Sequence, residues 1–167
     1  MNVTIRPWRA DDAPSLSRAL SDPAILCRLR DGIPFPYTES DALDYINAML
    51  SANRNSTFAY AVDLDGTAVG SIGLFRQENI HRRTAELGYY LAQEHWGNGI
   101  MTAAVKLACE KVFADTDIVR IFAMPFANNF GSRRVLEKAG FNCEGIMKCN
   151  AFKDGKLLDT ALYALTI

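Results

Sequence analysis

Hydrophobic and polar residues alternate with a period of two in several stretches of the chain. Residues 2–8 and 58–64 alternate in this way, and residues 68–75 continue the pattern after the dipeptide Asp65-Gly66. A period of two predicts strands with one buried face, and Asp-Gly between two such runs predicts a two-residue hairpin turn. Residues 82–91 are rich in β-favouring side chains and supply the next strand. The first half of the chain therefore predicts a three-stranded antiparallel meander, with residues 2–8 as an edge strand.

Other stretches carry the signals of helices. Aspartates and an early proline open the first helix, Thr38-Glu39-Ser40-Asp41 resembles a capping box, and asparagines precede the last helix, which ends at Gly140. The expected helices cover residues 11–20, 21–29, 38–52, 100–113 and 128–140.

The order of elements in the second half predicts how the strands are arranged. A helix over residues 100–113 separates the strand at 82–91 from an apolar strand at 118–124, and such a crossover usually places its two strands parallel. Residues 141–152 and 156–167 predict a closing hairpin. Because no repeat or low-complexity linker interrupts this order, the sequence predicts a mixed α/β fold in a single domain over residues 1–167.

The segment 31–38 is not expected to be regular. Its two prolines each remove a backbone donor and bias the preceding residue away from helix. A stiff aromatic loop of this kind either covers a core or lines a binding cleft, and the sequence leaves both interpretations open.

Composition limits the classes of function. Hydrophobic residues make up 49% and charged residues 22% of 167 residues, as in ordinary globular proteins, and the net charge of -1 predicts no broad attraction to nucleic acid or membranes. No apolar run approaches the roughly twenty residues that span a bilayer. The four cysteines lack metal-site spacing, which favours reduced thiols in the cytoplasm. Strand parity with Met147 predicts that Cys143 and Cys149 fill the core.

A glycine corner between the strand at 82–91 and the helix at 100–113 is the strongest candidate site. It reads Trp96-Gly97-Asn98-Gly99, and the first amides of the following helix have no intrahelical acceptors. Glycine lets a ligand approach the backbone closely, so the corner suits a phosphate, although a plain surface turn is the alternative. The sequence lacks the third glycine of a dinucleotide site and the Gly-Lys-Ser/Thr of a P-loop. The ligand expected here is therefore a phosphate-bearing cofactor of another kind.

Taken together, these motifs resemble the GCN5-related N-acetyltransferase (GNAT) superfamily, and more narrowly its ribosomal-protein-alanine acetyltransferase (RimJ/RimL-like) branch. The resemblance spans essentially the whole chain. It rests on Ile5-Arg6-Pro7-Trp8 with Asp12-Ala13, Pro36-Tyr37-Thr38 with Asp41-Ala42, Ala85-Glu86-Leu87-Gly88-Tyr89, Trp96-Gly97-Asn98-Gly99, Asn129 and Ser132 with Leu136-Glu137-Lys138-Ala139-Gly140-Phe141, and Asp154-Gly155 followed by Asp159.

The resemblance implies a fold and a cofactor. The fold is a twisted, mostly antiparallel sheet of about seven strands, with helices on both faces and one parallel pair splayed at the coenzyme A site. Acetyl-CoA is the implied co-substrate, and no metal is implied. Met101 stands where the family's pyrophosphate loop has a small residue, which is expected to narrow the approach of the cofactor. The cofactor contacts implied are Leu91, Trp96, Gly97, Asn98, Gly99, Ile100, Met101, Thr102, Asn129, Ser132 and Arg134.

The implied chemistry is direct attack of a neutral amine on the acetyl thioester, which requires a base for the amine and an acid for the leaving thiolate. By resemblance Glu86 is the base, acting through water; the alternative is a structural ion pair with Arg82 or Arg83. Ser132 or Tyr163 is the acid, the alternatives being that Ser132 only caps its helix and that Tyr163 is a core aromatic. Tyr37 and Glu86 are expected to shape the acceptor cleft.

The leading hypothesis is therefore a cytoplasmic N-acetyltransferase that acts on a protein N-terminal amine or a small amine. A coenzyme A-binding module without turnover is the alternative. We expect no nucleic acid or membrane partner, and either a monomer or a homodimer formed through the edge of the closing hairpin.

Overall fold

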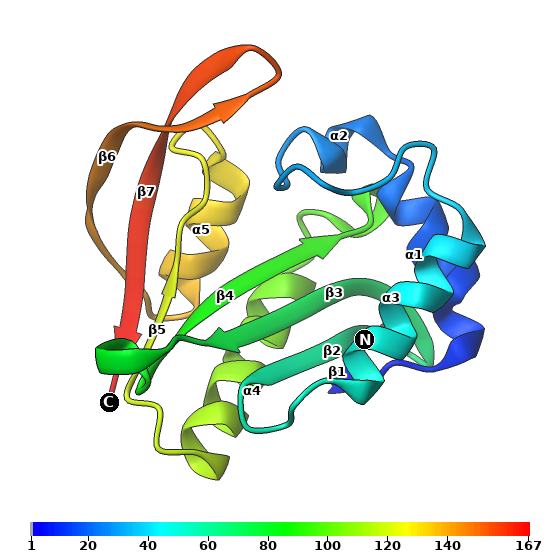
Figure 1. The fold of residues 1–167 in the computed structure, drawn as a ribbon, viewed down its shortest axis with the longest axis horizontal. Coiled ribbons are helices and arrows are strands. Elements are labelled where there is room, and N and C mark those ends of the chain that lie inside the picture. The colour runs from blue at the N-terminus through cyan, green and yellow to red at the C-terminus, as the bar shows by residue number, and fades with distance from the viewer. Residues whose placement is uncertain (1) are drawn as a thin grey trace.

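The computed structural model describes residues 2–167, which form one seven-stranded sheet of order β1-β2-β3-β4-β5-β7-β6 (Figure 1). Neighbouring strands are antiparallel except for β4 and β5, which are parallel. The predicted mixed fold with one parallel pair is confirmed. The strands are β1 (Val3–Arg6), β2 (Thr57–Leu64), β3 (Thr67–Arg76), β4 (Thr84–Leu91), β5 (Arg120–Ala123), β6 (Asn142–Lys153) and β7 (Lys156–Thr166).

Five α-helices lie between these strands, close to the predicted ranges. The capping box is present, with the Thr38 hydroxyl accepting from the amide of Asp41 and the Asp41 carboxylate accepting from the amide of Thr38. The second helix ends at Leu26, earlier than predicted. The helices are α1 (Ala13–Leu20), α2 (Pro23–Leu26), α3 (Glu39–Ser51), α4 (Ile100–Asp115) and α5 (Phe130–Lys138), with 3-10 turns at Ala10–Asp12, Asn79–His81 and Gln93–His95.

Each face of the sheet packs on its own group of helices. In the view of Figure 1, α4 crosses behind the sheet and α3 lies in front of it. The larger core cluster joins the sheet to α4 and α5, and the second joins it to α1, α2 and α3. Successive residues of a strand point to opposite faces. Accordingly, Leu87 and Leu91 of β4 pack in the α4 core, whereas Tyr90 packs against the α1–α3 core.

The parallel strands β4 and β5 separate soon after they pair. Their register joins Thr84, Ala85 and Glu86 to residues 120–122, while β4 continues to Leu91. Within the described chain, residues 87–91 of β4 thus have no partner on the β5 side, although β3 pairs with them on the other side. This splayed pair was expected, and it leaves an open backbone edge that leads directly to the glycine corner.

The prediction that Cys143 and Cys149 fill the core is wrong, because both are exposed. Strand β6 lies at the edge of the sheet, and its register with β7 shifts between Cys143 and Gly145 and again between Met147 and Ala151. Cys149 has a left-handed φ of 51° within the second irregularity. Such bulges break the two-residue alternation on which the prediction rested.

The helices of the described chain, residues 2–167, include none that is both long enough and apolar enough to cross a bilayer.

Candidate active site

The glycine corner forms an open turn at the start of α4. Gly97 and Gly99 have φ values of 79° and 75°, in the left-handed region, and a Cβ built on either would meet no described atom within 4 Å. No acidic side chain of the described chain lies in the first turn of α4. The first helical amides, the positive end of the helix dipole and the open space together suit an anion.

Met101 does not narrow the approach to the corner, contrary to the expectation from its size. Its side chain is 5% exposed and packs in the core with Ile100, which is 1% exposed. Because both side chains point into the protein, only their backbone lines the corner. Although Met101 is larger than the residue usual at this position in the family, the approach to the helix amides therefore remains open.

Trp96 fixes the corner to the end of β4. Its indole Nε1 donates to the carbonyl oxygen of Leu91 at 2.8 Å. This hydrogen bond occupies the Leu91 carbonyl, a backbone acceptor that was expected to face the cofactor. The Arg28 guanidinium lies 5.2 Å from the centroid of the Trp96 ring, within cation–π range. The sequence reasoning missed Arg28, since no local motif marks it and its partner is 68 positions away. This cation adds positive charge next to the glycine corner.

Glu86 lies where β4 and β5 part. It is the last β4 residue that pairs with β5, and it shares its strand face with Tyr90, so its side chain points toward the α1–α3 side. The side chain is 19% exposed and accepts a hydrogen bond from the guanidinium of Arg30. The expected alternative of a pair with Arg82 or Arg83 is wrong, because the partner comes from the segment after α2.

Ser132 of α5 lies on the other face of the sheet from Glu86, beside Tyr89 of β4. Its hydroxyl lies 2.8 Å from the hydroxyl of Tyr89 on β4, which also donates to the Ser132 carbonyl at 3.1 Å. The helix is capped by Asn129, whose Oδ1 accepts from the amide of Ser132 at 3.2 Å. Ser132 therefore does not cap the helix with its side chain. Burial raises the pKa of Tyr89, although the hydrogen bond with Ser132 opposes that rise.

Tyr163 lies in the core beneath α5. It is 0% exposed, and its hydroxyl accepts from Arg133 Nε at 3.1 Å and donates to Glu137 Oε1 at 2.9 Å. Burial raises the pKa of this phenol. These contacts favour the interpretation of Tyr163 as a core aromatic. They also hold Arg133 inward, while Arg134 remains exposed at the surface with one weak contact to Glu137 at 3.4 Å.

The proline-rich loop covers a core through Tyr37, the first of the two interpretations that the sequence left open. Tyr37 is 6% exposed within the α1–α3 core, and burial raises its pKa to about 12. Phe35 is 68% exposed. The structure thus places the Tyr37 side chain in the core and Phe35 on the surface.

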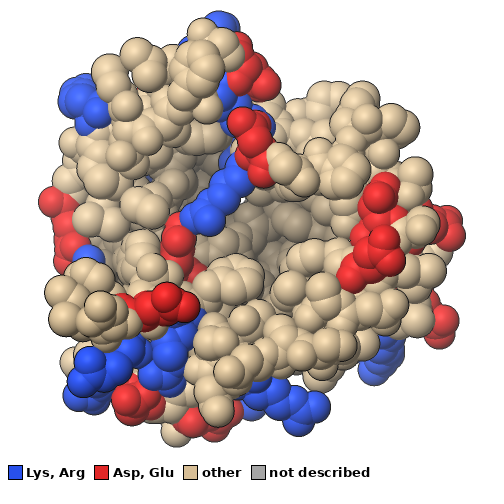
Figure 2. Space-filling view, viewed as in Figure 1, with Lys and Arg blue, Asp and Glu red and all other residues tan. Residues whose placement is uncertain are grey.

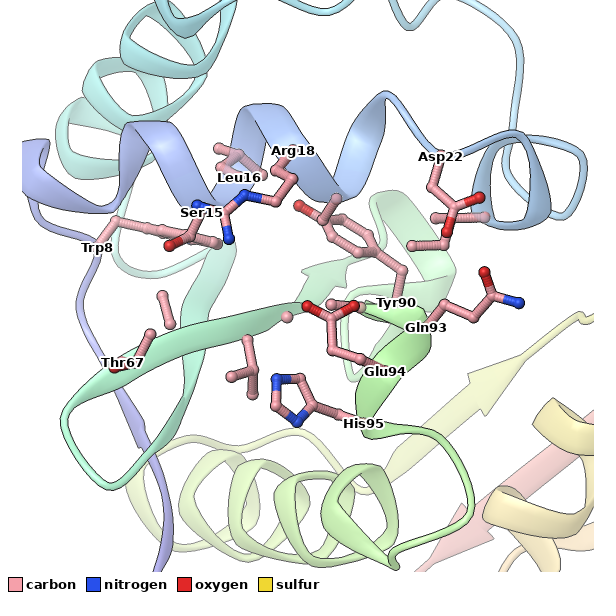
Figure 3. A pocket seen from close by; sticks show the side chains of 16 residues that line it. Trp8, Ser15, Leu16, Arg18, Asp22, Thr67, Tyr90, Gln93, Glu94 and His95 are labelled. Carbon is pink, nitrogen blue, oxygen red and sulfur yellow. The ribbon is translucent and has the colours of Figure 1, made fainter.

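A separate cavity of about 220 Å³ lies beside the corner, on the α1 side of β4. Figure 3 shows Ser15 and Arg18 of α1 on one side of it, with Glu94 and His95 of the turn before Trp96 on the other. The residues that line this cavity include none of those predicted for the site, so it is distinct from the glycine corner.

Within residues 2–167, no group of three or more His, Cys, Asp or Glu side chains is arranged to hold a metal ion.

Comparisons with known proteins agree with this geometry. A family model described as "Acetyltransferase (GNAT) domain" matches residues 2–142. The chain is 40% identical over 101 residues to a probable N-acetyltransferase, YjcK, of Bacillus subtilis (strain 168), a match that covers 60% of this chain and only 56% of that relative. An uncharacterized N-acetyltransferase, p20, of Bacillus licheniformis is 27% identical over 167 residues, which cover 98% of this chain and 92% of the relative.

A solved structure is similar over nearly the whole chain. It is that of Mycobacterium smegmatis RimJ in complex with CoA-disulfide, with a TM-score of 0.87 and 29% identity, covering 98% of this chain and 81% of that one.

Proposed function

The chain belongs to the GNAT acetyltransferase family, and on that premise we propose that it transfers an acetyl group from acetyl-CoA to a primary amine. The observation that carries this proposal is the gap between β4 and β5: the unpaired edge of β4 begins after Glu86, runs over residues 87–91 and ends at the glycine corner. A cofactor with a diphosphate and a long thioester arm requires an anion site joined to a narrow backbone-lined channel.

The residues present fit such a cofactor. The amides at the start of α4 and the backbone of residues 97–99 would hold the diphosphate, because the space around Gly97 and Gly99 is open and no acidic side chain of the described chain lies in the first turn of α4. Thr102, Asn129 and the exposed Arg134 are further proposed contacts along the coenzyme A arm. Bound acetyl-CoA supplies the activated acetyl thioester.

The proton transfers are assigned to two side chains on opposite sides of the gap. Glu86 accepts, through water, the proton that an ammonium acceptor loses before it can attack. The Ser132 hydroxyl, held by Tyr89, donates its proton to the departing thiolate and is reprotonated by the proton that the attacking nitrogen loses as the amide forms. Backbone N–H groups on the unpaired edge of residues 87–91 would donate hydrogen bonds to the thioester oxygen, where negative charge develops. Tyr163 is the weaker candidate for the acid, because its hydroxyl already bonds Arg133 and Glu137.

The acceptor is proposed to be a protein N-terminal amine or a small amine. A relative that is 30% identical over 121 residues is named a ribosomal-protein-serine acetyltransferase of Escherichia coli (strain K12), and this likeness motivates the inclusion of ribosomal-protein N-termini in any acceptor panel. We propose a cytoplasmic location, where the four free cysteines would stay reduced. A monomer and a homodimer joined along the exposed edge strand β6 are both consistent with the fold.

The test is release of free thiol from acetyl-CoA with a panel of small amines and N-terminal peptides, with mass spectrometry of the acceptor. Acceptor-dependent thiol release and an acetylated product are expected. If acetyl-CoA raises the melting temperature but no acceptor in a broad panel releases thiol, the chain is a coenzyme A-binding module without turnover.

A further inference from the structure

Two ion pairs bridge the cleft in which Glu86 lies. Arg30 contacts the Glu86 carboxylate, and Lys153 Nζ lies 3.0 Å from the carboxylate of Asp31. These pairs join the segment after α2 to β4 and to the end of β6, across 56 and 122 positions of sequence. Figure 2 shows this face hollowed between the closing hairpin and the helical side, with basic and acidic side chains in a line across the hollow. We call these four residues the ion-pair bridge.

The bridge has a fixed side and an exposed side. Glu86 and Lys153, both on strands, have side chains that are only 19% and 12% exposed. Arg30 and Asp31, on the irregular segment, have side chains that are 80% and 78% exposed. The segment is therefore attached over the cleft by two charges of its own, each on a sheltered partner of opposite sign.

We propose that Arg30 is a specificity-determining residue, whose guanidinium occupies in the free protein the place beside Glu86 that the acceptor's ammonium group takes together with the water that relays its proton. This rests on the proposed function. A mostly sheltered carboxylate is costly to leave without a partner, so the cation that leaves must be replaced by another cation. An alkylammonium group can make that exchange, whereas an amide or another uncharged group cannot. The substrate class is therefore primary amines that are protonated at neutral pH.

Replacing Arg30 on Glu86 by the acceptor's ammonium group costs little free energy, because the Arg30 side chain is mostly exposed. Ion pairs with an exposed partner contribute little, since water and salt screen them. Removing Arg30 is thus expected to lower the KM for a cationic acceptor about two- to fivefold, with kcat and the KM for acetyl-CoA unchanged. Lys153→Ala frees Asp31 and its neighbour Arg30 from the hairpin, and should lower the same KM by a smaller factor.

The experiment compares the wild type with Arg30→Ala, Arg30→Lys and Lys153→Ala, using n-butylamine as the acceptor. Arg30→Lys keeps the cation and should restore a KM near that of the wild type. Lys106→Ala is the matched control, because Lys106 is an exposed cation on α4, on the opposite face of the sheet. An unchanged or higher KM in Arg30→Ala, or an equal fall in the control, would overturn the proposal.

A binding measurement separates this inference from the proposed function. Isothermal titration with n-butylamine, and with its uncharged N-acetyl derivative, requires no turnover. Arg30→Ala should bind the amine about two- to fivefold more tightly than the wild type and bind the derivative equally well. If neither protein acetylates the amine but this difference is present, the proposed function fails and the role of Arg30 stands. If the variant binds both ligands as the wild type does, the role of Arg30 is refuted.

Discussion

Replacing Glu86 by glutamine is expected to slow acetyl transfer by about 10²- to 10³-fold, while acetyl-CoA binds as before. General bases contribute about 10²- to 10⁴-fold. We expect the lower part of that range, because the side chain is 19% exposed and water can replace part of its function. A factor of 100 corresponds to about 2.7 kcal/mol of transition-state stabilisation.

Cofactor affinity should be spared because Glu86 is remote from the glycine corner. Leu91 lies five positions further along the strand, a distance of about 16 Å along β4. Glutamine matches the shape of glutamate and can still accept from Arg30. Since that arginine is 80% exposed, losing the charge of the pair should change the free energy of unfolding by no more than about 1 kcal/mol.

The assay measures kcat from thiol release and the dissociation constant of acetyl-CoA by calorimetry. Glu110→Gln is the matched control, because it makes the same substitution at an exposed position of α4 and should leave both quantities unchanged. Wild-type turnover in Glu86→Gln would remove Glu86 from the mechanism. A large loss of acetyl-CoA affinity would show instead that the side chain supports the cofactor site.

Three further predictions concern the corner, the acid and a buried ion pair. Gly99→Val should weaken acetyl-CoA binding about tenfold or more in calorimetry. The control Gly66→Val changes a glycine with a left-handed φ of 94° in the turn between β2 and β3, and it should lower stability without changing acetyl-CoA affinity. Equal acetyl-CoA affinities of Gly99→Val and the wild type would refute the assignment of the corner to the cofactor. Ser132→Ala should lower kcat, while Tyr163→Phe should keep activity and lower the free energy of unfolding by about 1–3 kcal/mol in urea, and the reverse result would exchange their roles. Burial acts to raise the pKa of Asp12, but hydrogen bonds from Arg6 and from the Arg9 amide outweigh burial, so the pKa is lowered. The ionised carboxylate therefore stabilises the fold above about pH 4, and this contribution is lost as the pH falls. Asp12→Asn should therefore cost about 3 kcal/mol at pH 7 and progressively less below pH 4 in urea denaturation, and a cost independent of pH would contradict the assignment.

Local signals predicted most of the fold. The capping box at Thr38 and Asp41, the turn at Asp65-Gly66 and the crossover from β4 to β5 each depend on a few adjacent residues, so their geometry follows from short-range chemistry. The corner could be predicted for the same reason, since a left-handed glycine before a helix leaves a signature in the sequence.

What the sequence did not predict depends on contacts between distant residues. Arg30 finds Glu86 only because the segment after α2 passes over β4, and Tyr89 finds Ser132 only because α5 packs beside the splayed strand. The direction of the Met101 side chain depends on how α4 is rotated against the sheet, which residue size alone does not fix. No periodicity in the chain records these contacts.

The most direct test of the account is the mass of the acceptor after incubation with acetyl-CoA. The account predicts that a primary amine gains the mass of one acetyl group, with one free thiol released per acceptor, and that Glu86→Gln slows both equally. Tight binding of acetyl-CoA with no acetylated acceptor across small amines and N-terminal peptides would contradict it.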